Sequence, residues 1–288
     1  MIALAARILV AAFALLVAQI VAAGLVVAAF GSDGLPSAVP GSLPFQVASN
    51  LILVVVVAWL AQRARWRGWR LAGALAVVLY GIAIFNSIIE AVFFGFFSVR
   101  TGGVILLMTA LSTALFSPAL LLFAKKDSSS SARSEWKLCL TVPRFAAGAA
   151  AYLLIYFAFG MMIFPFIGDF YSELGTPPLA GVVGMALFVR GPIFVALAVL
   201  IIAMSGASRK QTILMVAVGM SVIGGVAPLM VPSSLFPDEV RLAHFIEVST
   251  ENFLFGWILG MLLTRPVSPL SDRRILGDPA PPGVATAS

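Results

Sequence analysis

Long apolar runs separated by short polar segments dominate the pattern along this chain. Eight such runs are present, each close to or longer than the roughly 20 apolar residues that a helix needs to cross a bilayer. A transmembrane barrel would instead show segments of about ten residues in which apolar and polar positions alternate. The pattern therefore predicts an all-α, polytopic transmembrane helical bundle of about eight membrane-spanning helices.

Hydropathy along the chain sets the approximate bounds of the eight runs. We expect spans at residues 2–30, 45–61, 71–98, 103–124, 145–167, 179–204, 212–231 and 240–264. Residues 1–265 would then form one transmembrane bundle. The first run begins with a short basic segment and also fits a cleaved signal peptide, but it is longer than the usual apolar region of such peptides, so we expect a retained helix.

Two polar segments are too poor in apolar residues to fold by themselves. Residues 127–134 are rich in serine, and residues 266–288 are rich in proline and small residues. Neither segment can bury enough apolar surface to offset the entropy of ordering it. We expect the first to be a flexible loop and the second to be a disordered cytoplasmic tail.

The composition predicts that most of the protein surface contacts lipid and not water. Hydrophobic residues make up 61% of the chain and charged residues 10%, whereas a soluble domain carries about 25% charged residues. The net charge of +6 resides in short loops between the apolar runs, so we expect contact with a lipid bilayer and not with nucleic acid. The single cysteine, Cys139, has no partner for a disulfide and no metal-binding spacing around it. No cofactor is predicted.

Basic residues gather in alternate loops. Fifteen of the 18 lie at the chain start, after the second, fourth and sixth runs, or after the eighth: Arg7, Arg63, Arg65, Arg67, Arg70, Lys125, Lys126, Arg133, Lys137, Arg144, Arg209, Lys210, Arg265, Arg273 and Arg274. The opposite loops contain Arg100 and Arg241. Because cytoplasmic loops carry the excess of lysine and arginine, both termini are predicted to be cytoplasmic, as in a protein of the bacterial inner (plasma) membrane.

Six of the polar or ionisable residues inside the predicted spans are candidate site residues. Glu90 and, one turn before it, Asn86 lie in the third run, and Arg190 lies near the middle of the sixth. The eighth run carries His244, Glu247 and Glu251. The spacing of these last three, i, i+3 and i+7, places them on one face of a helix.

A charged side chain in the centre of a bilayer costs at least about 2.5–3.5 kcal/mol, so these groups are not expected to face lipid. We predict that the third, sixth and eighth spans meet, with Arg190 between the acids. Gly191-Pro192 in the sixth run predicts a kink or a break there, since proline removes a helical hydrogen bond. Broken helices at this depth often mark binding sites in transporters.

Three functional interpretations remain open from the sequence. The first is a carrier with an outward-facing site for a proton, a cation or a cationic solute, in which Glu90, Glu247 and Glu251 bind the ligand. The second is an accessory protein in which the same residues form a static network. The third is an intramembrane metal-dependent enzyme with His244 and Glu247 as first ligands, completed by Glu251 and Glu90.

Enzymatic activity is the less expected of these interpretations. One histidine in the whole chain rules out a metal site with several histidines, and no Ser/His/Asp set or phosphate-binding loop is present. No catalytic residue is therefore assigned. The sequence specifies neither the substrate, nor a metal, nor the oligomeric state.

Overall fold

The computed structural model describes residues 2–33, 35–36, 39–123, 136–175 and 177–267. Within this part of the chain, eight helices are long and apolar enough to cross a membrane. The predicted all-α bundle of eight spans is confirmed, and the protein is a multi-pass membrane protein. The serine-rich loop at 127–134 and residues 268–288 of the predicted tail lie outside the described residues.

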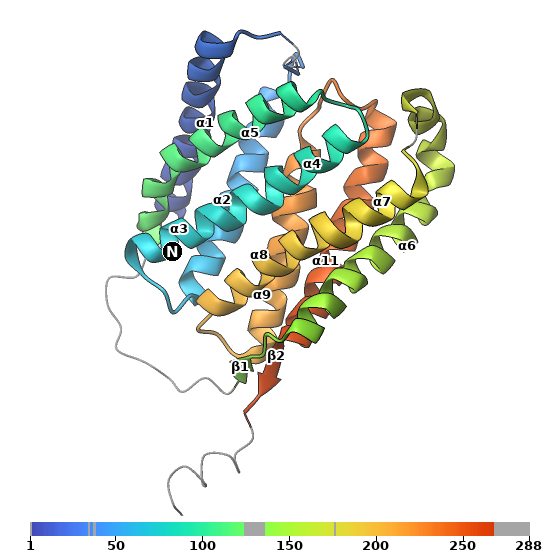
Figure 1. Cartoon of the computed structure of the whole chain (residues 1–288). Helices are drawn as coiled ribbons and strands as arrows, with labels where there is room; N and C mark the ends of the chain where they lie inside the picture. Colours follow the sequence, from blue (N-terminus) through green and yellow to red (C-terminus); the bar gives the residue numbers. More distant parts are fainter. Residues whose placement is uncertain (1, 34, 37–38, 124–135, 176, 268–288) are drawn as a thin grey trace, which may run out of the picture.

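Five spans consist of one helix or of a helix with a short 3₁₀ extension, and three are interrupted (Figure 1). In chain order the elements are α1 (Ile2–Phe30), α2 (Leu43–Arg63), α3 (Gly68–Tyr80), η1 (Gly81–Phe85), α4 (Asn86–Phe93), α5 (Val99–Phe116), η2 (Ser117–Phe123), β1 (Trp136–Leu138), α6 (Val142–Leu174), α7 (Leu179–Met185), η3 (Ala186–Arg190), α8 (Gly191–Met204), α9 (Arg209–Ser221), η4 (Val222–Val226), α10 (Ala227–Met230), α11 (Asp238–Leu263) and β2 (Thr264–Pro266).

Two of the predicted bounds are corrected by local backbone geometry. The third span was expected to continue to residue 98, but its helix ends at Phe93. Gly95 takes a positive φ of 81°, which turns the chain out of the helix and which glycine adopts readily. The fifth span continues past residue 167 to Leu174, and Pro165 lies inside that helix.

One end of the bundle brings together the connections that carry most of the basic residues; we call it the basic end. Backbone hydrogen bonds join the α2–α3 and α8–α9 connections there: Arg65 N donates to Met204 O (2.8 Å) and Gly206 N donates to Arg63 O (2.8 Å). The strands β1 and β2 pair antiparallel at the same end, with Lys137 opposite Arg265 (Figure 1). Pro266, which was predicted to be the first residue of the tail, belongs to β2.

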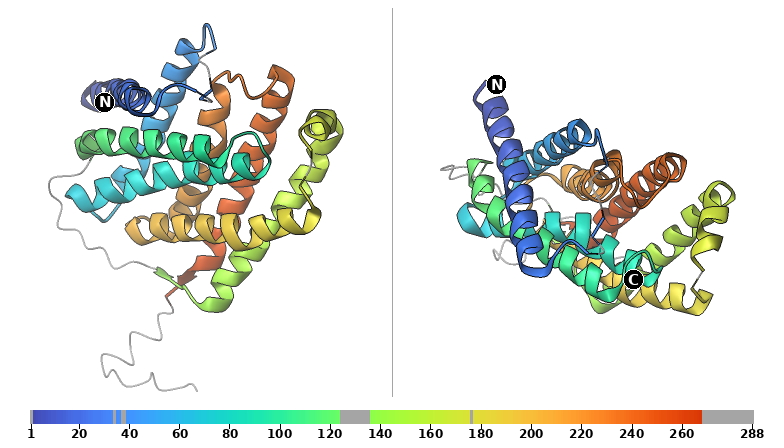
Figure 2. Two further views of the ribbon diagram at one scale, coloured as in Figure 1. Left: turned by 45° about the horizontal axis from the view of Figure 1, so that its top comes forward. Right: turned by 90° about the horizontal axis from the view of Figure 1, so that it is seen from above.

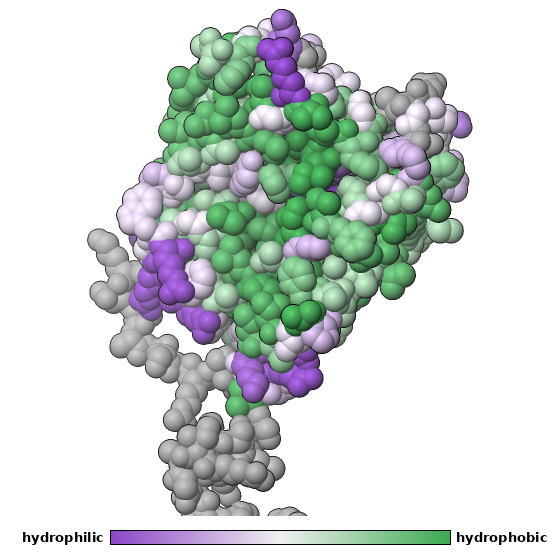
Figure 3. Space-filling view, in the orientation of Figure 1, coloured by the Kyte–Doolittle hydropathy of each residue, from purple (hydrophilic) through white to green (hydrophobic). Residues whose placement is uncertain are grey.

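Backbone pairing distinguishes the two ends of the molecule. Within the described residues, the backbone hydrogen bonds that join segments distant in sequence all lie at the basic end. Contacts at the opposite end are made by side chains. On the face shown in Figure 3, hydrophilic residues gather at the two ends, and a broad hydrophobic belt lies between them. This belt is compatible with contact with lipid.

The assignment of the basic end to the cytoplasm leads to a testable expectation. In a Cys139→Ser background, Lys210→Cys places a thiol at the exposed start of α9, and Ser172→Cys places one near the exposed end of α6. Because the basic side is retained in the cytoplasm, a membrane-impermeant thiol reagent should label Ser172→Cys in intact cells and label Lys210→Cys only after lysis. The reverse labelling would contradict the orientation.

Helices α9 and α11 form the tightest pair in the bundle. Gly256 and Gly260 lie four residues apart on α11, and a Cβ atom on either would lie 2.8 Å from a Cα atom of α9, that of Ala217 or Ile213 respectively. Small residues at this spacing let two membrane helices approach closely. The seventh span is the most enclosed and α6 is the least, and Figure 2 shows α6 at the rim of the bundle.

The three interrupted spans contain π-helical turns, η1, η3 and η4. In each, the following residue donates its backbone N–H five residues back, as Gly191 does to Ala186 O. The kink or break predicted at Gly191-Pro192 takes this form, and the helix continues as α8. Pro192 and Pro228 each follow a π turn by two residues. The wider turn accommodates a residue that has no N–H to donate.

Candidate functional site

Glu90 and Arg190 form an ion pair between the third and sixth spans. Glu90 lies on α4, one turn after η1, and Arg190 is the last residue of η3. Arg190 Nη1 lies 2.5 Å from Glu90 Oε1, and their side chains are 8% and 29% exposed. Tyr156 of α6 donates its hydroxyl to the same carboxylate oxygen (2.8 Å). The predicted meeting of Glu90 with Arg190 is confirmed.

Aromatic rings enclose the Arg190 guanidinium. Its Cζ lies 5.5 Å from the ring centroids of Tyr152 and Tyr156 and 5.9 Å from that of Phe194. These three rings form an aromatic box, in which ring faces attract the cation and exclude water. Arg190 Nε is buried and has no hydrogen-bond partner among the described residues. The ion pair with Glu90 is therefore the main polar contact of this cation.

Glu251 lies on α11 and is almost fully buried, with 5% of its surface exposed. It interacts electrostatically with Arg190, and also with Glu247 and Glu90, which repel it. Among the described residues, Glu251 forms no ion pair. The expected inward orientation of Glu251 is confirmed, but Arg190 binds Glu90 directly and interacts with Glu251 only through space.

His244 and Glu247 form a second polar pair on α11, nearer its start. His244 Nδ1 lies 2.7 Å from Glu247 Oε2, and both side chains are largely buried. The other ring nitrogen, Nε2, lies 2.9 Å from the Tyr171 hydroxyl of α6. Both nitrogens of the imidazole are therefore engaged, and the pair connects α11 to the rim helix α6.

Asn86 lies at the start of α4, directly after the π turn η1, and is completely buried. Neither its amide nitrogen nor its amide oxygen has a hydrogen-bond partner among the described residues. Buried amides are nearly always hydrogen-bonded. Asn86 thus places unused donors and an acceptor one turn from Glu90.

Sequence reasoning missed the tyrosines of this region. Three of the four tyrosines in the chain lie on α6, namely Tyr152, Tyr156 and Tyr171. Each contacts, through its ring or its hydroxyl, a member of the polar cluster. This cluster consists of Asn86, Glu90, Arg190, His244, Glu247 and Glu251. A signal was present, since a tyrosine hydroxyl inside a membrane needs a polar partner. The composition counts tyrosine among the hydrophobic residues, and this hides the signal.

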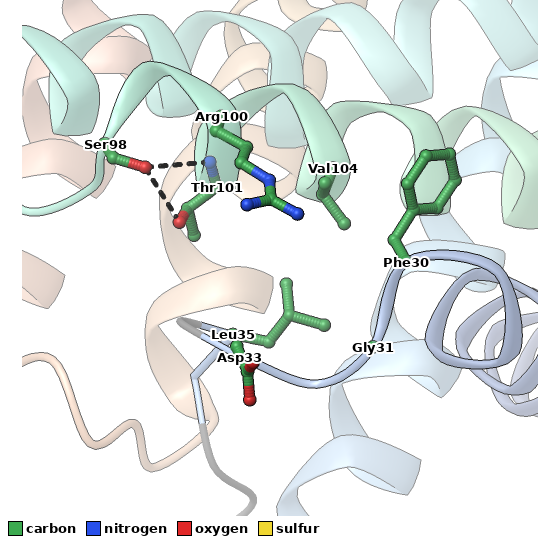
Figure 4. Close-up of a pocket in the computed structure, with 8 residues that line it drawn as sticks. All are labelled: Phe30, Gly31, Asp33, Leu35, Ser98, Arg100, Thr101 and Val104. Carbon is green, nitrogen blue, oxygen red and sulfur yellow. Dashed lines mark hydrogen bonds between the residues drawn. The ribbon is translucent and has the colours of Figure 1, made fainter.

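Two cavities lie elsewhere in the molecule. A cavity of about 280 Å³ lies between the end of α1 and the start of α5, where Arg100 points inward and Ser98 accepts a hydrogen bond from Thr101 N (Figure 4). A second, of about 120 Å³, lies among α1, α2, α3 and α5 and is lined by Gln19 and Tyr80. None of the six predicted site residues lines either cavity.

The metal-binding arrangement considered from the sequence is not assembled. Within the described residues, no group of three or more His, Cys, Asp or Glu side chains could hold a metal ion. His244 and Glu247 are adjacent, but Glu251 and Glu90 do not complete a shell around them. The donor set expected for a metal-dependent enzyme is therefore lacking in this part of the chain.

Comparison with known proteins finds no family model, no curated protein and no solved structure that matches this chain. The functional argument consequently rests on the geometry and charges of the cluster.

Proposed function

We propose that this protein is a membrane carrier with a buried site for a proton or a small cation, formed by Glu90, Glu247 and Glu251. Arg190 acts as the internal counter-charge. The observation that carries this proposal is the imbalance of charge: three carboxylates share the interior of the bundle with one guanidinium. The identity of the membrane as the inner membrane is part of the same proposal and follows from the distribution of basic loops.

The imbalance favours a ligand with positive charge. Glu90 neutralises Arg190 directly. Among the described residues, Glu251 and Glu247 therefore remain as acids that form no ion pair with an arginine or lysine. His244 is the one other group in the cluster that can carry positive charge. Uncompensated carboxylates away from water are costly. A bound proton or cation removes that cost, so the site has an intrinsic affinity for one.

A static network explains the same residues less well. Polar contacts between membrane helices stabilise a bundle by only about 0.6 kcal/mol on average, with a maximum of about 1.7 kcal/mol. A network that served packing alone would need balanced charges and satisfied amides. This cluster has an excess of acids and the unpartnered amide of Asn86.

The backbone geometry around the cluster favours a binding site whose residues can change position. Arg190 belongs to a π turn, and η1 ends next to Asn86, one turn before Glu90. The third π turn, η4, packs against both η1 and α11. Such turns are frequent at functional sites because their hydrogen bonds can shift register within an otherwise regular helix. Transporters use interrupted helices in this way at the depth of their binding sites.

Ligand-dependent thermal stability tests the proposal. We expect detergent-solubilised wild-type protein to be stabilised by protons or by one member of a panel of cations (Na⁺, K⁺, Mg²⁺, tetramethylammonium, guanidinium), since a ligand at 100 times its Kd adds about 2.7 kcal/mol. Glu251→Gln should fold and lose this response. Glu239→Gln, which changes an exposed acid in the first turn of α11, should keep it.

Two outcomes contradict the carrier. Wild-type stability that ignores every cation and does not vary between about pH 5 and pH 8 would exclude a titratable or cation-binding site. Loss of folded protein in Glu251→Gln, with normal folding of Glu239→Gln, would favour the static network, because the Glu251 carboxylate would then be needed to hold the bundle together.

A further inference from the structure

We propose that the ligand is a proton and that it reaches the acids through Tyr171, His244 and Glu247, in that order. This inference rests on the proposed carrier function and adds the identity of the ion and its path. The path begins at the end of the bundle opposite the basic end, close to the last residues of α6 and the first turns of α11.

Two consecutive hydrogen bonds carry the inference as far as Glu247. Tyr171 O lies 2.9 Å from His244 Nε2, and His244 Nδ1 lies 2.7 Å from Glu247 Oε2. Glu251 follows Glu247 one helical turn deeper, and the two carboxylates interact electrostatically. With a rise of about 1.5 Å per residue, the path from His244 to Glu251 descends about 10 Å into the bundle.

Aromatic rings surround the start of this path. Phe94 and Phe96, from the segment that follows α4, contact Tyr171, with ring centroids 5.9 Å apart in both cases. Phe236, from the segment before α11, contacts Phe96 (5.3 Å) and His244 (5.4 Å). These rings form a collar around the two polar groups.

The collar discriminates between protons and other cations. A metal ion would have to shed its water shell to pass such rings and would need a cage of oxygen ligands beyond them. Within the described residues, no group of three or more His, Cys, Asp or Glu side chains could hold a metal ion there. A proton needs only a chain of groups that can accept and donate, and Tyr171, His244 and Glu247 are such groups.

The transfer can be written for the tautomer that carries its proton on Nδ1. A proton from water binds the Tyr171 oxygen as the Tyr171 O–H proton moves to His244 Nε2. The Nδ1 proton then moves to Glu247 Oε2. Tyrosine and imidazole both end neutral, the imidazole now protonated on Nε2, and the carboxylate has become a carboxylic acid. Histidine suits this role because each ring nitrogen can hold the proton.

Other charged groups near His244 do not interrupt the path. Arg241, one turn earlier on α11, is held by Asp238 (2.7 Å) and by Leu229 O (3.1 Å). Beyond Tyr171 lie Glu90 of α4 and Arg190 of η3, which interact with Tyr171 electrostatically. The groups in hydrogen-bond contact with the imidazole are therefore Tyr171 and Glu247.

The test is the rate at which the buried carboxyl is protonated after a pH jump. Purified protein in lipid nanodiscs is shifted from about pH 8 to about pH 5, and the carboxylic acid C=O stretch is followed by time-resolved infrared spectroscopy. The band that disappears in Glu251→Gln reports Glu251. His244→Gln should slow the appearance of that band by at least about tenfold, as expected for loss of a positioned acid–base group.

Two further variants sharpen the result. Tyr171→Phe keeps the ring packing and removes only the hydroxyl, so it should also slow the band while leaving its final amplitude unchanged. Tyr80→Phe is the matched control: it removes a tyrosine hydroxyl that bonds Leu106 O in another part of the bundle, and it should leave the rate unchanged. Added imidazole should partly restore the rate in His244→Ala.

The outcomes separate this inference from the carrier itself. A Glu251 band that rises at the wild-type rate in both His244→Gln and Tyr171→Phe would overturn the path and leave the ion site in place. Absence of any Glu251-dependent band in wild-type protein would overturn the proton as ligand. If cations also failed to stabilise the protein, the proposed carrier function would be rejected together with the proton path.

Discussion

Glu90→Leu should destabilise this protein more than any other single substitution in the cluster. The change leaves the Arg190 guanidinium inside the aromatic box without its ion-pair partner. Removing one partner of a buried ion pair costs about 3–5 kcal/mol, because an uncompensated charge remains buried. We expect a large fall in the melting temperature of the detergent-solubilised protein, measured by fluorescence-detected size exclusion after heating.

A double-mutant cycle checks the cause of this effect. Arg190→Leu in combination with Glu90→Leu removes both charges and keeps a residue that packs against Tyr152, Tyr156 and Phe194, so the double variant should regain much of the lost stability. If Glu90→Leu melted like wild-type protein, or if the second substitution restored nothing, the ion pair would not be the dominant interaction of either residue.

The second large effect is expected where α9 and α11 meet. Gly256→Ala would place a Cβ atom 2.8 Å from both Ala217 Cα and Val216 O, and Gly260→Ala would place one 2.8 Å from Ile213 Cα. Backbone atoms cannot rotate away, so the two helices must separate. Overpacking of this kind costs about 1–3 kcal/mol at each position, and the double variant should yield little folded protein in membranes.

Glycines with open surroundings provide the matched comparison. A Cβ atom on Gly24 or Gly103 would meet nothing within 4 Å. Gly24→Ala and Gly103→Ala remove the same backbone freedom from a helix and should leave the yield and the melting temperature unchanged or slightly raised. Equal behaviour of the Gly256/Gly260 and Gly24/Gly103 pairs would show that the close approach of α9 and α11 is not needed for folding.

The fold was predictable because a bilayer imposes length and composition on every span. The apolar runs therefore located all eight helices, although not every end. The features that the sequence did not predict depend on contacts between distant segments or on the backbone geometry of single residues. The β1–β2 pairing involves three residues in each strand, too short for a sequence pattern. The helix end at Phe93 depends on the positive φ of Gly95.

The candidate site was partly predictable for a similar reason. The cost of leaving charges in lipid implied that Glu90 and Arg190 would meet, and helical spacing placed His244 next to Glu247. Which acid binds Arg190 could not be derived, since both Glu90 and Glu251 were suitable by depth. The role of Tyr171 was also hidden, because it depends on how α6 packs beside α11.

The concentration of backbone pairing at the basic end makes the two sides of this membrane protein energetically unequal. Separating the helices at that end would break hydrogen bonds of the β1–β2 pair and of the Arg65–Met204 and Gly206–Arg63 contacts. Separating them at the opposite end breaks no backbone–backbone pairing. It parts aromatic side chains, at about 0.5–1.5 kcal/mol for each ring pair, and side-chain hydrogen bonds such as that between Tyr171 and His244. For the proposed carrier, we therefore expect exchange with the side opposite the basic end. The orientation of any vectorial transport would then be set by this asymmetry of the scaffold, before a substrate or a membrane potential acts on it.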